Sequence, residues 1–467
     1  MLRLSSYLIL SDRLENGGYA VLSGLSGAIE LVSEGLYELL NERIQNGEPH
    51  SLYIEDDFLP PEMLDTFIKR SYITDASHEE ERAYVQKVAL AMHELSARQP
   101  GVVIVPNLDC NYRCVYCFEK PLQSKLRERK TKMDIACVDA VYRAIGQLES
   151  EIGLIAEGIS LYGGEPLLAE DKEVVEYLVD RGVERGYRFA AITNGHDLNA
   201  YMGLLGQNRI STLQITIDGP EDIHDRRRIA LDGSSSFQKI IANMRQAIGE
   251  TDVTISVRVN LDGDNYKAFG ELLDVFDREG WLNNNRLLVS AAIVSQRDQR
   301  GAIFPLQEIN AVKAELSSVA RRYNNVEIGS QQSAFGDSVI SSLVSNKPYG
   351  LRSCFCAASS GMYIFLPDGT ISSCWDSLGE ERSYIGRYSK EGLFLDKMET
   401  TRKFSRSVAN IPACLDCKYC LVCAGGCPQY AEYNSGDIYQ PHCGDFQETY
   451  SWVLAEAVEK YLKASGL

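Results

Sequence analysis

Thirteen cysteines restrict the possible folds of this chain more than any other feature, because they are unevenly placed along its 467 residues. Three of them lie in the stretch VPNLDCNYRCVYCFEK. No cysteine lies between Cys137 and Cys354, and a second dense group then runs from Cys354 to Cys443. Disulfides are disfavoured because nothing in the sequence suggests export. Tight cysteine clusters in a cytosolic enzyme more often bind metal.

The first group has the pattern Cys-x3-Cys-x2-Cys, formed by Cys110, Cys114 and Cys117 directly after an apolar segment of strand length. Three thiolates can bind three irons of a [4Fe–4S] cluster and leave the fourth iron without a protein ligand. Zinc is the structural alternative, but zinc sites usually take four ligands, often as two close pairs. The spacing therefore favours an iron–sulfur cluster with one open iron.

Residues 101–335 alternate between short apolar segments and segments long enough for helices. The apolar segments are GVVIVPNL, GISLY, FAAITN, QITI, TISVRVN and LLVSAAI. This alternation predicts a parallel sheet with helical crossovers. Six such units predict an α/β fold, a partial (β/α)6 TIM barrel, in which the chemistry is done at the carboxyl ends of the strands.

Two glycine-containing motifs fall at expected strand ends, Tyr162–Pro166 (YGGEP) after the second strand and Thr216–Pro220 (TIDGP) after the fourth. An aromatic residue, Tyr116, also precedes the third cysteine of the first group. Together with the cysteine spacing, these motifs resemble those of radical S-adenosylmethionine (SAM) enzymes, in the subfamily with a C-terminal SPASM domain that includes anaerobic sulfatase-maturating enzymes.

The resemblance implies that SAM binds the open iron and that an external flavodoxin or ferredoxin supplies the electron that yields a 5′-deoxyadenosyl radical. Gly163, Gly164 and Glu165 would bind the SAM amino group, because glycine allows close approach and a carboxylate accepts hydrogen bonds from an ammonium. Thr216 would help to hold the SAM carboxylate. Arg258 needs an anionic partner, for which the SAM carboxylate or a barrel salt bridge are the candidates.

Other strand-end residues have two interpretations each. Residues 193–195 (TNG) line the SAM cleft or, as we favour, only shape a turn. Asp218 and His224 fit a turn as well as a site, and a lone histidine is usually not a metal ligand. Val289 and Ala291 of the sixth strand would contact adenine. The sequence contains no side chain that we would assign as a general acid or base.

The second cysteine group contains the array Cys-x2-Cys-x5-Cys-x3-Cys and resembles the SPASM pattern, which holds two auxiliary [4Fe–4S] clusters. The resemblance assigns the first auxiliary cluster to Cys374, Cys427, and Cys354 and/or Cys356. It assigns the second to Cys414, Cys417, Cys423 and Cys443. If only one of Cys354 and Cys356 is a ligand, the first auxiliary cluster has an open iron.

Two cysteines remain outside these assignments. Cys137 lies in a predicted helix, IACVDAV, and we expect a small core residue there. Cys420 adds a cysteine that the usual pattern lacks. It is a spare thiol, an alternative ligand or a group that binds substrate-derived atoms.

The rest of the chain divides into three further expected parts. Residues 1–100 read as three short strands followed by three helices. This order resembles the winged-helix-like module that recognises leader peptides, and an N-terminal cap on the barrel is the alternative. Residues 350–446 form the expected SPASM region, and residues 447–467 form a terminal helix.

Composition excludes some partners. The formal net charge is −18, so a phosphate-binding surface is disfavoured and we expect no nucleic acid partner. The sequence contains no run of about 18 apolar residues, so it predicts no membrane span. The first residues, MLRLSSYLILSDRLE, lack the features of a signal peptide. We therefore expect a cytoplasmic location.

These expectations predict a maturase that binds a ribosomally made precursor peptide by its leader and installs a crosslink, which we expect to be a cysteine thioether. Carbon–carbon crosslinking is one alternative. Sulfatase-type oxidation of Cys or Ser to formylglycine is another, disfavoured because Cys374 is followed by Trp375 and only then by Asp376. A non-catalytic iron–sulfur carrier is disfavoured by the intact cysteine and Gly-Gly-Glu motifs.

Overall fold

The computed structural model describes residues 1–46, 52–55, 58–117, 119, 131–153, 156–293, 306–329, 333–444 and 446–466. The chain forms two compact units. The first is built from Met1–Ala97, Gln331–Ser360 and Phe404–Leu467, and the second from Arg98–Ser330 and Gly361–Lys403. Residues 361–403, which we expected within the SPASM region, thus belong to the same compact unit as the barrel strands. The division into functional domains stays a prediction.

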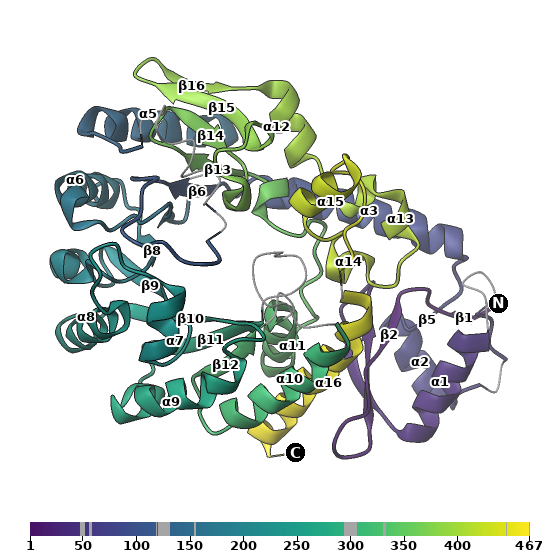
Figure 1. Ribbon diagram of the computed structural model, residues 1–467. Helices are drawn as coiled ribbons and strands as arrows, with labels where there is room; N and C mark the ends of the chain where they lie inside the picture. The colour runs from purple at the N-terminus through teal and green to yellow at the C-terminus, as the bar shows by residue number, and fades with distance from the viewer. Residues whose placement is uncertain are drawn as a thin grey trace. The chain divides into compact units, whose positions relative to one another are not determined.

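A single sheet organises the second unit, and eleven of its strands lie in the described part of the chain (Figure 1). Its parallel strands are sequential neighbours in the sheet. They are β6 Gly101–Ile104, β7 Ile159–Leu161, β8 Phe189–Thr193, β9 Ile210–Thr216, β10 Thr254–Leu261, β11 Leu287–Ile293 and β12 Val326–Gly329. The six expected strands are all present. The short strand β12 is an addition that the sequence analysis missed.

Helices connect these strands, and Figure 1 shows α5, α6, α8 and α9 along one face of the sheet. Their bounds are α5 Ile135–Ile152, α6 Lys172–Val183, α7 Glu221–Arg227, α8 Ser236–Glu250, α9 Phe269–Arg278 and α10 Leu306–Ala320. Helix α5 illustrates why they form: Asp134 caps its first turn, and Gly153 ends it in a left-handed conformation. Its buried residues Val138, Val141, Ile145 and Leu148 recur at helical spacing. The unit is an open α/β sheet consistent with a partial barrel.

Strand β10 shows how the sheet separates its two faces. Ile255, Val257 and Val259 are buried, and they alternate with the half-buried polar residues Arg258 and Asn260. Because side chains alternate along a strand, the apolar residues share one face and the polar ones share the other. The polar face of β10 contributes to the candidate site described below.

The sheet continues past β6 into the segment that we expected to be part of the SPASM region. β13 Met362–Phe365 pairs parallel with β6, and an antiparallel extension follows. It consists of β14 Thr370–Ser372, β15 Tyr384–Ser389 and β16 Gly392–Leu395, after which comes α12 Lys397–Phe404. Val103 and Val105 pack with Ile364 and Leu366 in one apolar cluster. Burial against the barrel therefore stabilises these short strands, whose own sequences carry little alternation.

The N-terminal segment of the first unit has two small sheets. Its strands are β1 Arg3–Leu4, β2 Leu8–Leu10, β3 Tyr19–Ser23, β4 Ile29–Val32 and β5 Ile73–Thr74. Its helices are α1 Glu34–Asn46, α2 Pro61–Lys69 and α3 His78–Ser96, as expected. Five described strands stand where three were expected, because the first one breaks after Leu4: β1 pairs with β5, whereas β2 pairs with β3. The buried Arg3 forms a 2.6 Å ion pair with Glu81 of α3 beside this break.

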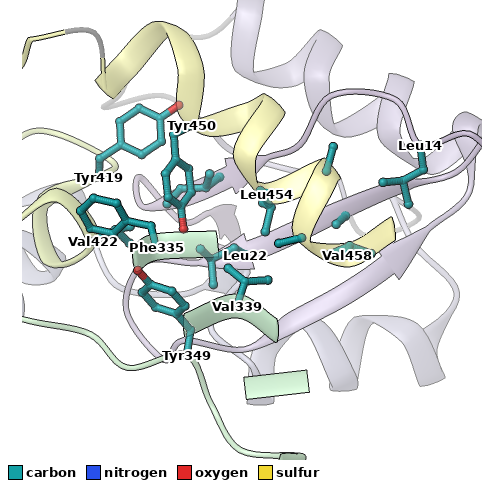
Figure 2. Close-up of a cluster of buried hydrophobic side chains, with 14 of the residues drawn as sticks. Leu14, Leu22, Phe335, Val339, Tyr349, Tyr419, Val422, Tyr450, Leu454 and Val458 are labelled. Carbon is teal, nitrogen blue, oxygen red and sulfur yellow. The ribbon is translucent and has the colours of Figure 1, made fainter. Parts of the chain in front are cut away.

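The C-terminal segments of the same unit complete its core (Figure 2). They contain α11 Ser333–Ser345, α13 Pro412–Leu415, α14 Cys420–Cys423, α15 Pro428–Ser435 and α16 Phe446–Ser465. In Figure 2, Tyr450 and Leu454 of α16 lie beside Phe335 of α11 and Leu22 of β3. The terminal helix is therefore part of a core that the N-terminal strands share.

The described residues contain no helix with both the length and the apolar character needed to cross a membrane.

Candidate active site

A cavity of about 450 Å³ lies in the second unit, next to the carboxyl ends of β7 to β10. Cys110, Cys114 and Cys117 all line it. So do the other site residues expected in the barrel, namely Tyr116, Gly163, Gly164, Glu165, Thr216 and Arg258. The structure thus brings together residues from four strand ends and from the loop after β6.

Main-chain hydrogen bonds hold the loop that carries the three cysteines. Its residues 111–115 pair with residues 227–231, through bonds that include Arg113 N to Ile229 O at 2.8 Å and Val115 N to Arg227 O at 2.9 Å. The Cys110 sulfur accepts from the main-chain N–H of Tyr112 at 3.4 Å. Burial, followed by the charge of Glu165, raises the pKa of Cys110. The bare thiol is therefore held neutral, and a bound cation would favour the thiolate.

These three cysteines suit a cluster better than a single ion. In the described residues, no three His, Cys, Asp or Glu side chains form a group that could hold one metal ion. A four-iron cluster is larger than a zinc ion and holds its thiolates further apart. Three free cysteines arranged around one cavity fit that requirement.

The Gly163–Gly164 pair lets two main chains pass each other at close range. A Cβ atom on Gly164 would lie 2.3 Å from the carbonyl oxygen of Asp109, and one on Gly163 would lie 2.4 Å from that of Asn107. Gly163 also has a φ of +135°. The two glycines therefore allow a close approach to the start of the cysteine loop, and their approach to SAM stays a prediction.

Glu165 is buried and accepts three hydrogen bonds. Thr193 Oγ1 and Leu167 N donate to Oε1 at 2.6 and 2.9 Å, and Asn194 N donates to Oε2 at 2.6 Å. Burial raises the pKa of Glu165 to about 7, although these donors oppose the shift. A carboxylate has about four acceptor positions, so one on Oε2 remains for a ligand.

The TNG segment does more than shape a turn. Thr193 and Asn194 both line the cavity, and both orient Glu165 through the hydrogen bonds just described. Asn194 Nδ2 also lies 3.8 Å from the sulfur of Cys110. The interpretation that we favoured for this segment is therefore wrong, because β8 ends beside the carboxylate.

Tyr116 forms the centre of a buried polar network. Its hydroxyl donates to Asp218 and accepts from Arg228 Nη1 at 2.9 Å, while the guanidinium of Arg227 lies 5.1 Å from its ring centre. Burial raises the pKa of Tyr116, so it stays a neutral donor. Burial lowers the pKa of Arg228, but its interactions with Cys114, Tyr116 and Asp218 outweigh this and hold the pKa above its ordinary value. The sequence analysis missed both arginines, whose signal was the run RRR at the end of α7.

Thr216 and Arg258 are register partners on β9 and β10, so their main chains lie side by side. The side chain of Arg258 is half-buried, and its Nε donates to Asn260 Oδ1 at 3.1 Å. Both residues line the cavity, as does Asn260. A hydroxyl and a guanidinium on adjacent strand ends form a plausible binding wall for a carboxylate.

The expected contact of Val289 and Ala291 with adenine is wrong. These residues are register partners of Val257 and Val259 on β10, and register partners share a face of the sheet. Both are fully buried, and neither lines the cavity. The alternation of β10 explains this outcome, because the cavity meets the opposite, polar face.

His224 and Asp218 are structural turn residues. His224 is fully buried, and its Nδ1 accepts from Asp218 N at 3.2 Å. Its ring packs on Phe237 with ring centres 5.8 Å apart. Burial, followed by the charge of Arg228, lowers the pKa of His224 to about 3. The imidazole is therefore neutral, and it orients the turn after β9.

A further acidic residue, Glu119, was missed by the sequence analysis. It lines the cavity together with Trp375 and Asp376, and only 6% of its surface is exposed. In the described part of the chain its Oε1 has no hydrogen-bond partner. Its signal was a carboxylate two residues after the third cysteine. These three residues add two carboxyl groups and an indole to the cavity lining.

The second cysteine group places its members in both units. In the first unit, Gln447 Nε2 of α16 lies 3.8 Å from the Cys417 sulfur and 3.9 Å from that of Cys443. Burial raises the pKa of Cys414 to about 12, and the charges of Cys423, Cys417 and Cys443 add to the shift. The four cysteines assigned to the second auxiliary cluster are thus brought together.

The cysteines assigned to the first auxiliary cluster are divided. Cys354, Cys356 and Cys427 lie in the first unit, and Cys374 lies in the second, directly before Trp375 of the cavity wall. Burial raises the pKa of Cys354, although hydrogen bonds from Ser360 and Ser353 oppose the shift.

The two unassigned cysteines have different surroundings. Cys420 is buried and packs in an apolar cluster with Tyr7, Val85 and Ala89. Cys137 is half-buried, with its sulfur 3.1 Å from the hydroxyl of Tyr388, so the expectation of a core residue is wrong in part. Its place in the first turn of α5, next to the cap residue Asp134, explains the remaining exposure.

Comparison with known proteins places this site in a family. The model of the radical SAM superfamily matches residues 104–276, which run from β6 into α9 and include the cysteine loop. Residues 104–276 thus form a radical SAM domain. It is 22% identical, over 462 residues, to the radical SAM cyclopropyl synthase TigE of Paramaledivibacter caminithermalis, and the match covers 94% of this chain and 92% of TigE.

Two solved structures share the fold of this radical SAM enzyme. Native anSMEcpe with bound AdoMet has a TM-score of 0.57 at 14% identity, over 79% of this chain and 100% of that one. Streptococcus suis SuiB bound to the precursor peptide SuiA has a TM-score of 0.51 at 15% identity, over 94% and 98%. The radical SAM superfamily implies a [4Fe–4S] cluster and SAM, and the residues around the cavity fit both.

Proposed function

We propose that this radical SAM enzyme modifies a ribosomally made precursor peptide by removing hydrogen from a peptide carbon and closing a new bond. The observation that carries this proposal is one cavity lined by two sets of residues. The first, the cofactor set, consists of the cysteines and the polar strand ends that suit the cofactors. The second consists of Glu119, Trp375 and Asp376, and we assign it to the substrate.

Each residue of the cofactor set has a proposed role. Cys110, Cys114 and Cys117 hold the cluster, while Tyr116 and its hydrogen bonds to Asp218 and Arg228 fix the loop between the last two cysteines. When bound, the cluster and SAM together supply a 5′-deoxyadenosyl radical. The cavity walls must therefore position the substrate carbon and exclude water.

Two groups of polar residues in the cofactor set would orient SAM. The free acceptor position of Glu165, supported by the close packing of Gly163 and Gly164, suits the SAM ammonium. Thr216 and Arg258, which are register partners, suit the SAM carboxylate. The amino acid part of SAM would then be held at both ends.

Two auxiliary clusters complete the proposal, in a SPASM-type arrangement. Four cysteines hold the second one, and the contacts of Gln447 with Cys417 and Cys443 support this assignment. Cys374 and Cys427, with Cys354 and/or Cys356, hold the first one. Cys420 is not a ligand in this proposal, because the SPASM pattern leaves it out, although it shares an apolar cluster with the proposed ligand Cys414.

The N-terminal strands and helices would bind the leader of the precursor peptide. Their order of strands and helices supports this role, as does the similarity of nearly the whole chain to TigE. SuiB, whose fold covers 94% of this chain, has been solved with its precursor peptide SuiA. An external flavodoxin or ferredoxin would supply electrons.

The product we propose is a thioether between a cysteine sulfur and a carbon of the same peptide. Two hydrogens leave the peptide: the carbon loses a hydrogen atom to the 5′-deoxyadenosyl radical, and the thiol loses a proton as its sulfur bonds to that carbon. The one electron left over would pass to an auxiliary iron–sulfur cluster. Carbon–carbon ring closure is the second candidate, because the relative that spans 94% of this chain is named a cyclopropyl synthase. Both products lack the same two hydrogens, so mass alone does not separate them.

The test uses the reconstituted, reduced full-length protein with SAM and a candidate cysteine-containing precursor peptide. We expect 5′-deoxyadenosine to form and the peptide to lose two hydrogens. Alkylation of the product then separates the candidates, because a thioether removes a reactive thiol whereas ring closure leaves every thiol free. If no 5′-deoxyadenosine forms with or without peptide, the enzymatic proposal is wrong.

A further inference from the structure

Arg406 is a fully buried arginine in the first unit, 0% exposed, and it lies among the segments that carry the second cysteine group. Its guanidinium donates to four main-chain carbonyl oxygens. Nη1 donates to Gly426 O at 3.0 Å, Nη2 donates to Gly425 O at 3.0 Å and Gln440 O at 3.1 Å, and Nε donates to Ile438 O. Four of its five N–H groups are therefore satisfied by the main chain.

These four contacts join two segments that lead to cysteines. Residues 425 and 426 lie between Cys423 and Cys427, and residues 438–440 lead to Cys443. The segments also contact each other directly, since His442 N donates to Gly425 O at 3.0 Å. Arg406 thus fastens the main chain next to three proposed ligands, Cys423, Cys427 and Cys443.

The segment between Cys423 and Cys427 needs such support, because its conformation is unusual. Ala424, Gly425 and Gly426 have φ values of +58°, +77° and +69°, and a left-handed conformation is unfavourable for alanine. A Cβ atom on Gly426 would lie 1.8 Å from His442 O. The path of this chain therefore depends on contacts made from outside it.

The charge of Arg406 has no carboxylate partner in the described part of the chain. Carbonyl oxygens satisfy its N–H groups but leave a full positive charge in a buried place, which is unfavourable without an anion. The thiols of Cys414, Cys427, Cys356 and Cys423 lie within electrostatic reach of it, and they would carry negative charge only as thiolate ligands. These four cysteines belong to both proposed auxiliary clusters, and a cluster with thiolate ligands is an anion.

We propose that Arg406 is a positioning residue for both auxiliary iron–sulfur clusters. It fixes the main chain that presents Cys423, Cys427 and Cys443, and it supplies the buried positive charge that offsets the clusters. This inference rests on the ligand assignment in the proposed function. It adds a residue that no cysteine spacing reveals.

The test compares Arg406→Gln and Arg406→Lys in a full-length background in which Cys110, Cys114 and Cys117 are all alanine. Any iron that remains then belongs to the auxiliary clusters. The two readouts are the iron content and the reduction potentials of the clusters. Electron paramagnetic resonance measures the potentials. The half-exposed Arg70, which pairs with Glu30, provides the matched control Arg70→Gln.

Arg406→Gln should bind less iron and should shift the remaining potentials to more negative values, because removal of a cation disfavours adding an electron. Arg406→Lys keeps the charge but not the four carbonyl contacts, so it should retain potentials near those of the parent and still lose iron. It also provides the readout if the glutamine variant does not fold. Arg70→Gln should match the parent in both iron content and reduction potentials.

Two results would overturn the inference in different ways. If the parent background holds no iron, the ligand assignment is wrong, and the role of Arg406 is wrong with it. If the parent holds iron, but iron content and potentials are unchanged in both Arg406 variants, then the auxiliary clusters stand and Arg406 does not position them.

Discussion

The two cysteine groups of this enzyme are organised by opposite means. The first group lies within a loop of eight residues, beside a cavity of about 450 Å³ that is lined mainly by the ends of parallel strands. The second group extends over some 90 residues, and its cysteines in the first unit are held by short helices, left-handed turns and Arg406. The first arrangement suits a site that must admit a ligand. The second suits sites that are built into the packing.

The arginines of the two regions make the same distinction. Arg228 lies beside the first group and shares the hydroxyl of Tyr116 with the carboxylate of Asp218, so an acid already balances it. Arg406 lies among cysteines of the second group and contacts carbonyl oxygens. A buried cation that has a carboxylate nearby shapes a loop, whereas one without a carboxylate predicts an anion that has yet to bind.

The largest expected effect separates the two groups directly. Cys114→Ala should abolish formation of 5′-deoxyadenosine and lower the iron content from about twelve to about eight per chain, because the loss of one ligand removes one four-iron cluster. Cys417→Ala should lower the iron content by a similar amount and yet still cleave SAM, without yielding the modified peptide.

Cys137→Ala is the control for both variants, because that thiol is outside the proposed ligand sets, and it should keep full iron content and activity. Iron analysis and chromatography of the nucleoside measure the outcome. Normal SAM cleavage by Cys114→Ala would remove the distinction between the groups.

The next effect tests whether the first group depends on the strand ends around it. Gly164→Ala places a Cβ atom 2.3 Å from Asp109 O, so the cysteine loop must shift. A displacement of about 1 Å in such a site can lower turnover about 100-fold, and we expect that loss in SAM cleavage. The auxiliary iron should remain.

Gly249→Ala in α8 is the matched control, because its Cβ atom meets nothing within 4 Å. That variant should be as active as the parent and slightly more stable, since alanine favours a helix over glycine by roughly 1 kcal/mol. Equal activity in the two alanine variants would contradict the proposed packing of the cysteine loop.

A smaller effect concerns the buried network that stands beside the first group. Tyr116→Phe leaves Asp218 and Arg228 without the hydroxyl that joins them, and an unsatisfied buried group costs about 1–3 kcal/mol. We expect SAM turnover to fall about tenfold, on the scale of about 1.4 kcal/mol for each factor of ten. Tyr177→Phe removes a hydroxyl near the surface of α6 that contacts Asp139, and it should have no such effect. Steady-state kinetics with SAM as the varied substrate compares the two.

The sequence predicted the first group far better than the second, and the reason is distance along the chain. Cys110 to Cys117 and the YGGEP and TIDGP motifs are local patterns at strand ends, and parallel strands bring such ends to one edge. The contacts of Arg406 and the pairing of β13 with β6 join residues far apart in the chain, and neither has a local signal. Val289 and Ala291 were misplaced for a related reason: apart from Ser290 the strand is apolar, and only pairing with β10 shows that the face of Ser290 and Arg258 meets the cavity.

The smallest effect concerns protonation beside the first group. The pKa of His224 is about 3 in the folded chain, against an ordinary value of 6.5 when unfolded, so its contribution to stability is complete above pH 6.5 and is lost as the pH falls toward 3. Glu165 has the opposite sign: its pKa is raised from 4.5 to about 7, so its contribution is lost as the pH rises through that window. The two slopes oppose each other between pH 5 and 6.5, and the wild-type profile alone does not separate them.

His224→Asn isolates the histidine, because an amide oxygen can still accept from Asp218 N but does not take up a proton. The difference in free energy of unfolding between wild type and variant should change by about 1 kcal/mol from pH 7.5 to pH 5.5. The wild type should become less stable relative to the variant at the lower pH. Urea denaturation at both values measures it. A difference that does not depend on pH would mean that His224 is already hydrated or charged, and the turn after β9 would then be a titrating part of the site instead of a rigid support for Tyr116.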